Sequence, residues 1–176
     1  MMSARSVIVA YYSGEAPDIR GRMIDDVWGW DDERLESVHD YIQWLFPLAQ
    51  PSQANPYAPL LSREDAMAFA ANEHLRNRLL ESFRLMLRFY GLGMRPATAD
   101  GTIVTKNPSF DIRGRTWLRP GNHNYLRLTR ILISSHTLGL VEEARALQRF
   151  LVTLAGEHAD EISRGTLSYW IAAVPH

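Results

Sequence analysis

The sequence predicts an all-α fold, a single compact domain of about six helices with one long irregular loop over residues 94–121. Apolar residues recur at helical spacing in several segments. Capping residues precede those segments, and glycine or proline follows several of them. The length of 176 residues suits one domain, and an apolar fraction of 46% is typical of a globular protein. We therefore expect residues 1–176 to form one domain.

The N-terminal part predicts a strand-like segment followed by two helices. Val7–Tyr12 is expected to be extended, and residues 21–28 to hold a short helix. A longer helix is predicted from Asp31 or Asp32 to Phe46, because aspartate is a good N-cap and apolar residues follow at helical spacing. Pro47 ends this helix, and the four prolines of residues 47–61 predict a rigid loop.

Five further helices are predicted in the rest of the chain. Ser62 is expected to cap the first, with Asp65 at the capping-box position. The others are a long helix up to Tyr90, a helix capped by Asn122 that ends at Gly139, and two C-terminal helices, 140–155 and 161–174. Within the irregular loop, residues 102–105 can form a short strand of a minor β-ribbon.

Composition excludes several classes of site. The chain has no cysteine, so disulfides, thiolate catalysis and cysteine-based zinc sites are excluded. A net charge of −1 makes nucleic acid an unfavoured partner. No segment reaches the roughly 18 uninterrupted apolar residues of a membrane span, and the N-terminal apolar run is too short for a signal peptide. We expect a cytoplasmic protein with no transmembrane segment; its oligomeric state is left open.

Two polar helix faces are the main candidates for a functional site. The acidic face consists of Asp32, Glu36, His39 and Gln43, at spacings of four, three and four residues. The basic face consists of His123, Arg127, Arg130 and Ser134, at the same spacings. Residues 1–50 carry nine acids and four bases, whereas residues 101–140 carry six bases and one acid.

Two interpretations of these faces stay open. In the first, the faces pair with each other or face water, because arginine binds carboxylates in bidentate geometry. In the second, they line a cleft between helices 31–46 and 122–138, where Arg127 and Arg130 hold a small anion or a peptide C-terminus. A histidine there, His39 or His123, would titrate near neutral pH.

Other chemistry is less favoured. No HxxxH or HExxH spacing exists, so no metal site is predicted, although His39, His123, Asp31 and Asp40 carry possible ligands. No phosphate-binding glycine loop or serine-nucleophile motif is present, so no cofactor is expected and catalysis is disfavoured, though not excluded. Three arginines beside Trp117 offer a weak nucleic-acid patch, namely Arg113, Arg115 and Arg119.

Several motifs resemble the conserved domain of the opioid growth factor receptor family. They are HDYIQWLFPL (39–48), LLSRE (60–64), MLRFYGL (86–92) and NHNYLRLTRILISSHTLGL (122–140), in this order. GEAPDIRG and WDDERLE, further upstream, also fit, and the resemblance covers about residues 10–155.

The resemblance implies a ligand- or peptide-binding domain, with opioid peptide receptor activity as the family's described function. Animal members are described as receptors for Met-enkephalin and are associated with the nucleus. The resemblance brings no catalytic residues. The two polar faces and the matching motifs together give the candidate binding residues: Asp32, Glu36, His39, Gln43, His123, Asn124, Arg127 and Arg130. The alternatives are an uncharacterised enzyme with His39/His123 acid–base chemistry, and a structural or interaction protein with no small-molecule ligand.

Overall fold

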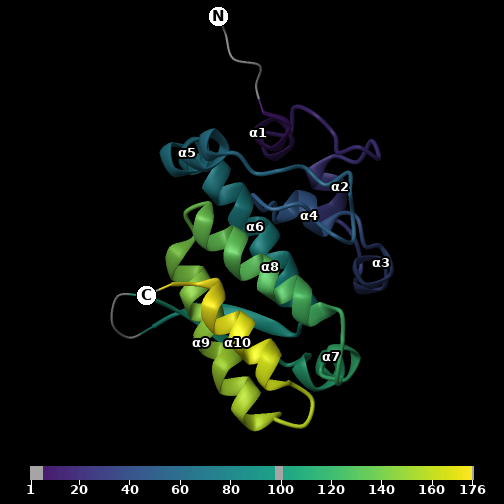
Figure 1. The fold of residues 1–176 in the computed structure, drawn as a ribbon, viewed down its shortest axis with the longest axis vertical. Coiled ribbons are helices and arrows are strands. Elements are labelled where there is room, and N and C mark those ends of the chain that lie inside the picture. The colour runs from purple at the N-terminus through teal and green to yellow at the C-terminus, as the bar shows by residue number, and fades with distance from the viewer. Residues whose placement is uncertain (1–5, 98–100, 176) are drawn as a thin grey trace, which may run out of the picture. The chain divides into compact units, whose positions relative to one another are not determined.

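The computed structural model describes residues 6–97 and 101–175 and is mainly α-helical, as predicted. These residues form ten helices and a two-stranded antiparallel sheet (Figure 1). They divide into two compact units, with the division between Ser82 and Phe83. We call them unit 1 and unit 2. The single domain expected for residues 1–176 stays a prediction.

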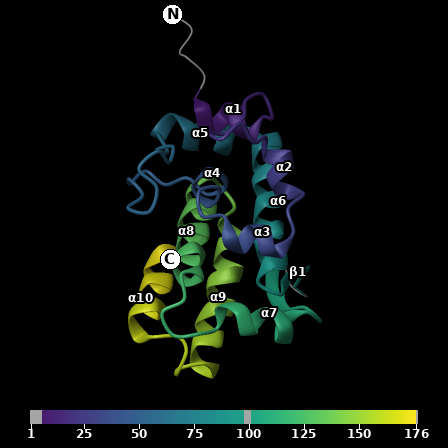
Figure 2. The same ribbon diagram turned by 90° about the vertical axis from the view of Figure 1, so that its right-hand side faces the viewer.

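Unit 1 is built from short helices around buried aromatic rings. It contains α1 (Val7–Tyr12), α2 (Ile24–Trp28), α3 (Asp32–Ser37), α4 (Ile42–Leu45), α5 (Arg63–Ala71) and the start of α6 (Glu73–Phe89). Helices α1 and α5 lie side by side (Figure 2). The buried Tyr12 hydroxyl donates to the carbonyl of Leu45 and lies 3.1 Å from Oγ of Ser82, which accepts from the Trp28 indole at 2.9 Å.

The expectation of an extended segment at Val7–Tyr12 is wrong, because this run forms helix α1. A short apolar run does not distinguish a strand from a buried helix by its periodicity. Here Oγ of Ser6 accepts from the backbone N–H of Ile8, which is an N-cap contact. The helix buries Ile8, Val9, Tyr11 and Tyr12.

The single helix predicted over residues 31–46 is also wrong. Asp31 caps its start, accepting from Arg34 N at 2.8 Å, but α3 ends at Ser37 and Val38 has extended backbone. The Tyr41 hydroxyl donates to the carbonyl of Leu35 at 2.9 Å, which satisfies an acceptor at the end of α3. After the break, all four residues of α4 and the flanking Tyr41 and Phe46 are buried. A single straight helix with a polar face could not bury all six residues from Tyr41 to Phe46, because their side chains point in all directions around the helix axis.

Residues 47–61 form an ordered loop in unit 1, as predicted. Leu61 N donates to the Leu48 carbonyl at 2.9 Å, and the two ends of the loop meet in an isolated β-bridge. The expected capping box is present at the start of α5, where Ser62 and Asp65 exchange hydrogen bonds. Within the loop, Asn55 accepts from Tyr57 N at 3.1 Å and forms a turn.

Unit 2 contains the end of α6, a β-hairpin and four helices. The strands β1 (Leu92–Pro96) and β2 (Thr102–Lys106) pair antiparallel, with Met94 opposite Val104. The helices are α7 (Phe110–Trp117), α8 (Asn124–Thr137), α9 (Val141–Glu157) and α10 (Arg164–Ala173). Helices α8, α9 and α10 lie side by side (Figures 1 and 2).

Two details of unit 2 correct the sequence expectations. Residues 94–121 are more regular than expected, because they hold α7 as well as the predicted ribbon. Asn122 does serve the start of α8, accepting from Asn124 N at 2.9 Å, although the helix begins two residues later.

Candidate functional site

The break after α3 divides the predicted acidic face. Asp32 and Glu36 are half-buried on α3, His39 is exposed in the connecting segment, and Gln43 is buried on α4. The Gln43 amide donates to the His39 carbonyl at 3.2 Å and accepts from Asn55 at 3.4 Å. Gln43 therefore connects the backbone at His39 with the side chain of Asn55, and it is not part of a solvent-exposed face.

The basic face lies on α8 but most of it is withdrawn from solvent. Arg127 and Ser134 are buried, Arg130 is half-buried, and His123 is exposed at the N-cap position. Burial lowers the pKa of Arg130 from its usual value. Asn124, also buried, accepts from the Tyr90 hydroxyl at 3.2 Å and from Arg127 at 3.5 Å.

The two predicted faces belong to different units. Asp32, Glu36 and His39 lie in unit 1, whereas Arg127 and Arg130 lie in unit 2. The predicted anion cleft between them stays a prediction, and so does a shared site for His39 and His123.

Unit 1 contains an open cavity that the sequence did not predict. Its volume is about 570 Å³, and its walls come from α1, the loop after it, α4 and the proline-rich loop. We call it the apolar cavity, because most of its lining is apolar: Val7, Ala10, Ala16, Pro17, Ile19, Trp44, Tyr57 and Pro59, with Asp18 as the charged member. Three of these side chains are large, apolar and well exposed: Val7 is 60%, Ile19 59% and Tyr57 72% exposed.

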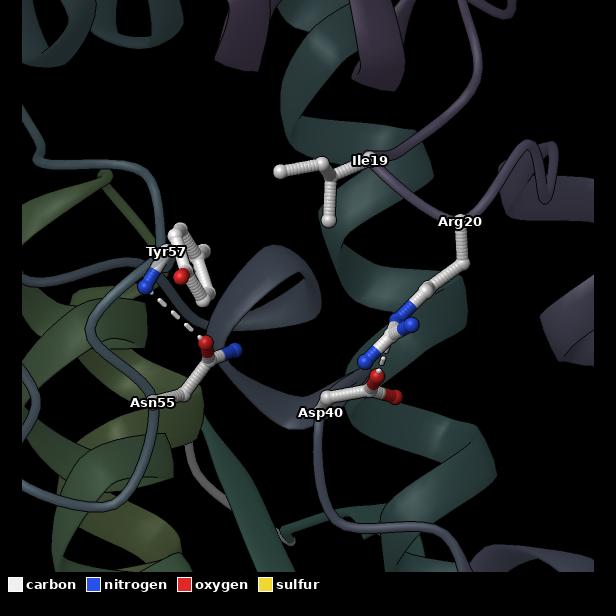
Figure 3. A pocket seen from close by; sticks show the side chains of 5 residues that line it. All are labelled: Ile19, Arg20, Asp40, Asn55 and Tyr57. Atoms are coloured by element: carbon white, nitrogen blue, oxygen red, sulfur yellow. Dashed lines mark hydrogen bonds and ion pairs between the residues drawn. The ribbon is translucent and has the colours of Figure 1, made fainter.

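A second cavity shares two walls with the first. It has a volume of about 190 Å³ and is lined by Ile19, Arg20, Asp40, Asn55 and Tyr57. Figure 3 shows the Arg20–Asp40 pair on one side of this polar cavity and Asn55 with Tyr57 on the other. Because Ile19 and Tyr57 line both cavities, the two are neighbouring parts of one site.

A network of ion pairs fixes the charged wall of the polar cavity. Arg22 Nη1 lies 2.8 Å from Asp40 Oδ1, and Arg20 Nε lies 3.0 Å from Asp40 Oδ2. Arg22 also pairs with Asp18 at 2.6 Å. Burial raises the pKa of Asp40, but hydrogen bonds and charge from Arg22 and Arg20 outweigh it, and the net pKa is lowered. Asp40 is therefore ionised at neutral pH.

Several N–H and O–H donors around the site lack an acceptor within the described residues. Trp44 is 6% exposed and lines the apolar cavity, yet its Nε1 has no hydrogen-bond partner there. The buried Tyr11 hydroxyl also has no hydrogen-bond partner among the described residues. The centroids of the Tyr11 and Trp44 rings lie 5.2 Å apart, and the rings pack edge to face. Burial raises the pKa of Tyr11, so this hydroxyl keeps its proton and remains a donor. A buried donor without an acceptor is costly, and both atoms are closed off from solvent in this structure.

Other predicted sites find less support. Trp117 is fully buried and donates to the Tyr90 carbonyl at 3.2 Å, so its ring offers no stacking surface to nucleic acid. Arg113, from the same patch, donates to the Phe89 carbonyl at 2.8 Å. Over residues 6–97 and 101–175, no three histidine, aspartate or glutamate side chains are grouped as metal ligands would be. In the same part of the chain no helix is long and apolar enough to cross a membrane.

Sequence patterns gave weak signals for the two cavities. The turn at Asn55–Tyr57 was predictable, and an aromatic residue in a proline-rich turn is easily left exposed. Ile19 is an isolated apolar residue in a polar loop. Neither feature predicts that Ile19 and Tyr57, 38 positions apart in the sequence, line the same cavities, because this depends on the folded path of both loops.

Comparison with known proteins places these residues in a family. The model of the opioid growth factor receptor (OGFr) conserved region matches residues 6–176. The chain is 35% identical over 159 residues to the opioid growth factor receptor of Mus musculus, which covers 88% of this chain and 24% of that protein. The Homo sapiens receptor is 33% identical, with 88% and 23% covered. The opioid growth factor receptor-like protein 1 of Mus musculus is 32% identical, with 84% and 31% covered.

This chain thus spans less than a third of the length of these curated relatives. No solved structure matches it.

Proposed function

The chain belongs to the opioid growth factor receptor conserved-region family, and from that premise we propose that it is a binding module whose unit 1 takes a peptide in the two neighbouring cavities. The curated relatives are named as receptors of an opioid growth factor, which supports a peptide as the ligand. The chain covers about a quarter of the receptor length, so the proposal concerns binding by this region.

One observation carries the proposal, namely the collection of exposed apolar side chains around one cavity. Val7, Ile19 and Tyr57 are each more than half exposed and all line the apolar cavity. Exposed apolar surface gathered in one place marks an interaction site more often than single exposed residues do. The ring of Trp44 forms part of the same wall, although its Nε1 atom is closed off from solvent.

The size of the cavities agrees with a peptide ligand. The apolar cavity, at about 570 Å³, is within the range of ligand pockets, and the polar cavity extends it. Two parts of the walls are fixed by the fold: the side chain of Asp18 by its bond to Arg22, and the backbone of Tyr57 by its turn with Asn55. The exposed side chains of Val7, Ile19 and Tyr57 would be ordered on binding.

The test is a nuclear magnetic resonance titration of the protein with Met-enkephalin, following the indole N–H signal of Trp44, assigned with Trp44→Phe. We expect this signal to shift, and Tyr57→Ala or Ile19→Ser to weaken binding about tenfold, since each removes apolar contact area. Met67→Ser is the matched control, because Met67 is 62% exposed on α5 and does not line either cavity. Equal affinities for wild type, Tyr57→Ala and Ile19→Ser would contradict the proposal.

The other functions stay predictions. An anion held by Arg127 and Arg130 is a second binding hypothesis, and Arg127 is tested in the Discussion. Acid–base catalysis by His39 and His123, or a purely structural role, gains no supporting observation from the two cavities, since neither histidine lines them.

A further inference from the structure

The polar cavity presents hydrogen-bond donors that have no partner among the described residues. Arg20 is 67% exposed, and of the five N–H groups of its guanidinium only Nε has a partner among the described residues, namely Asp40. The two terminal nitrogens remain available to a ligand.

Asn55 faces the same cavity with its amide. Its Oδ1 already accepts from Tyr57 N at 3.1 Å and keeps one further lone pair. Its Nδ2 makes one long bond of 3.4 Å to Gln43, which leaves one of the two amide hydrogens unused. Asp40, the acceptor in this cavity, is held by both Arg20 and Arg22.

The donor set suits a carboxylate. A guanidinium offers two parallel N–H groups to the two oxygens of a carboxylate, and such charge-assisted bonds are stronger than neutral ones. A ligand with a cationic group would find Asp40 already paired and would meet the Arg20 charge.

The neighbouring apolar cavity restricts how the carboxylate is carried. Ile19 and Tyr57 separate the two cavities, so the carboxylate and an apolar side chain must leave the ligand from adjacent points. In an extended peptide, successive side chains point to opposite sides. A C-terminal residue meets the requirement, because its carboxylate and its side chain leave the same Cα atom.

We propose that the site binds the free C-terminus of a peptide whose last residue is apolar. The carboxylate pairs with Arg20 and Asn55, and the last side chain enters the apolar cavity beside Trp44. This inference rests on the proposed peptide-binding function and adds the chemistry of the ligand.

The experiment compares N-acetylated tripeptides Gly-Gly-Leu, Gly-Gly-Phe and Gly-Gly-Met, each with a free carboxylate and with a C-terminal amide. Binding to the whole chain is followed by the Trp44 indole signal. We expect the free acids to bind about tenfold or more tightly than the amides, since the amide removes a charge-assisted contact. This preference should disappear in Arg20→Met and persist in Arg63→Met, because Arg63 is exposed at the start of α5 and lines neither cavity.

Arg20→Met is expected to fold, because Asp40 keeps its bond to Arg22 and exposed ion pairs contribute little to stability. Acetyl-Gly-Glu-Leu-amide tests an internal acidic side chain as the alternative source of the carboxylate. If it binds as tightly as the free acids, the C-terminal assignment is overturned.

Two further outcomes separate the inference from the proposed function. If acids and amides bind equally and Tyr57→Ala weakens both, the site binds peptides but the carboxylate inference is wrong. If none of the tripeptides shifts the Trp44 signal, both are contradicted.

Discussion

The Nε atom of Arg22 lies 2.6 Å from Oδ2 of Asp18, a carboxylate with no exposed side-chain surface. The other Asp18 oxygen accepts from the backbone N–H groups of Arg20 and Arg22, at 2.8 and 3.0 Å. The pair therefore fixes the loop that carries Ile19 and Arg20 to the two cavities.

Replacing Asp18 should destabilise the fold. Asp18→Ala removes the acceptor of two backbone N–H groups and leaves Arg22 without its buried partner. We expect the free energy of unfolding to fall by about 3 kcal/mol, measured by urea denaturation. Asp25→Ala is the control: its pair with Arg78 is longer, at 3.3 Å, and Asp25 is mostly exposed, so its loss should cost about 1 kcal/mol or less. Equal losses in the two variants would contradict the structural role of Asp18.

Asp40 should make stability depend on pH on the acid side. Its pKa is lowered in the folded state, despite the opposing effect of burial, because Arg22 and Arg20 stabilise the carboxylate. A lowered folded-state pKa contributes stability above the unfolded-state value of about 3.9, and this is lost as the pH falls through the folded-state pKa.

The measurement compares wild type with Asp40→Asn. At pH 7 we expect wild type to be more stable by about 1 kcal/mol, a modest value because the pair is partly exposed. The difference should shrink below about pH 4. A difference that stays constant from pH 7 to pH 3 would show that ionisation of Asp40 contributes nothing.

Gly91 should not tolerate a side chain. Its φ is 76°, a left-handed conformation that disfavours other residues, and an added Cβ would lie 2.7 Å from Phe110 Cα. Gly91→Ala should lower the free energy of unfolding by about 2 kcal/mol or more. Gly93→Ala is the matched control: nothing lies within 4 Å of its added Cβ, and its φ is not positive. Stability is measured by thermal or urea denaturation. Equal losses of stability in Gly91→Ala and Gly93→Ala would contradict the proposed steric and conformational requirement at Gly91.

Arg127 provides the test of the anion hypothesis. If Arg127 helps to hold an anion, inorganic phosphate should raise the melting temperature of wild type more than that of Arg127→Ala. Because Arg127 is buried, the substitution is also expected to lower the melting temperature without phosphate. The comparison therefore uses only the rise in melting temperature that phosphate causes in each protein. Equal rises in wild type and Arg127→Ala would argue against Arg127 as an anchor.

Local sequence signals predicted much of the helical structure. The N-caps at Asp31 and Ser62 were predictable because each is a hydrogen bond between a side chain and the backbone N–H three residues later. The long helix α6 was predictable because its apolar residues follow one face. These residues are all buried: Leu75, Leu79, Phe83, Met86 and, just beyond the helix, Tyr90.

The helix break at Val38 could not be predicted from the sequence, because apolar residues continue at helical spacing on both sides of it. The break depends on the hydroxyl of Tyr41 reaching the Leu35 carbonyl, and on packing that buries Tyr41, Trp44 and Phe46 together. This outcome divided the predicted acidic face and placed Gln43 inside unit 1.

Local features of the sequence were sufficient to predict the helical class of this protein, most helix starts, and its membership of a family whose motifs occur in order along the chain. These depend on local hydrogen bonds, on periodicity and on short motifs. The candidate site instead depends on tertiary packing, because Ile19, Trp44 and Tyr57 come from three separate segments that line one cavity. Their arrangement around the cavity follows from how unit 1 packs, and no spacing along the chain encodes it.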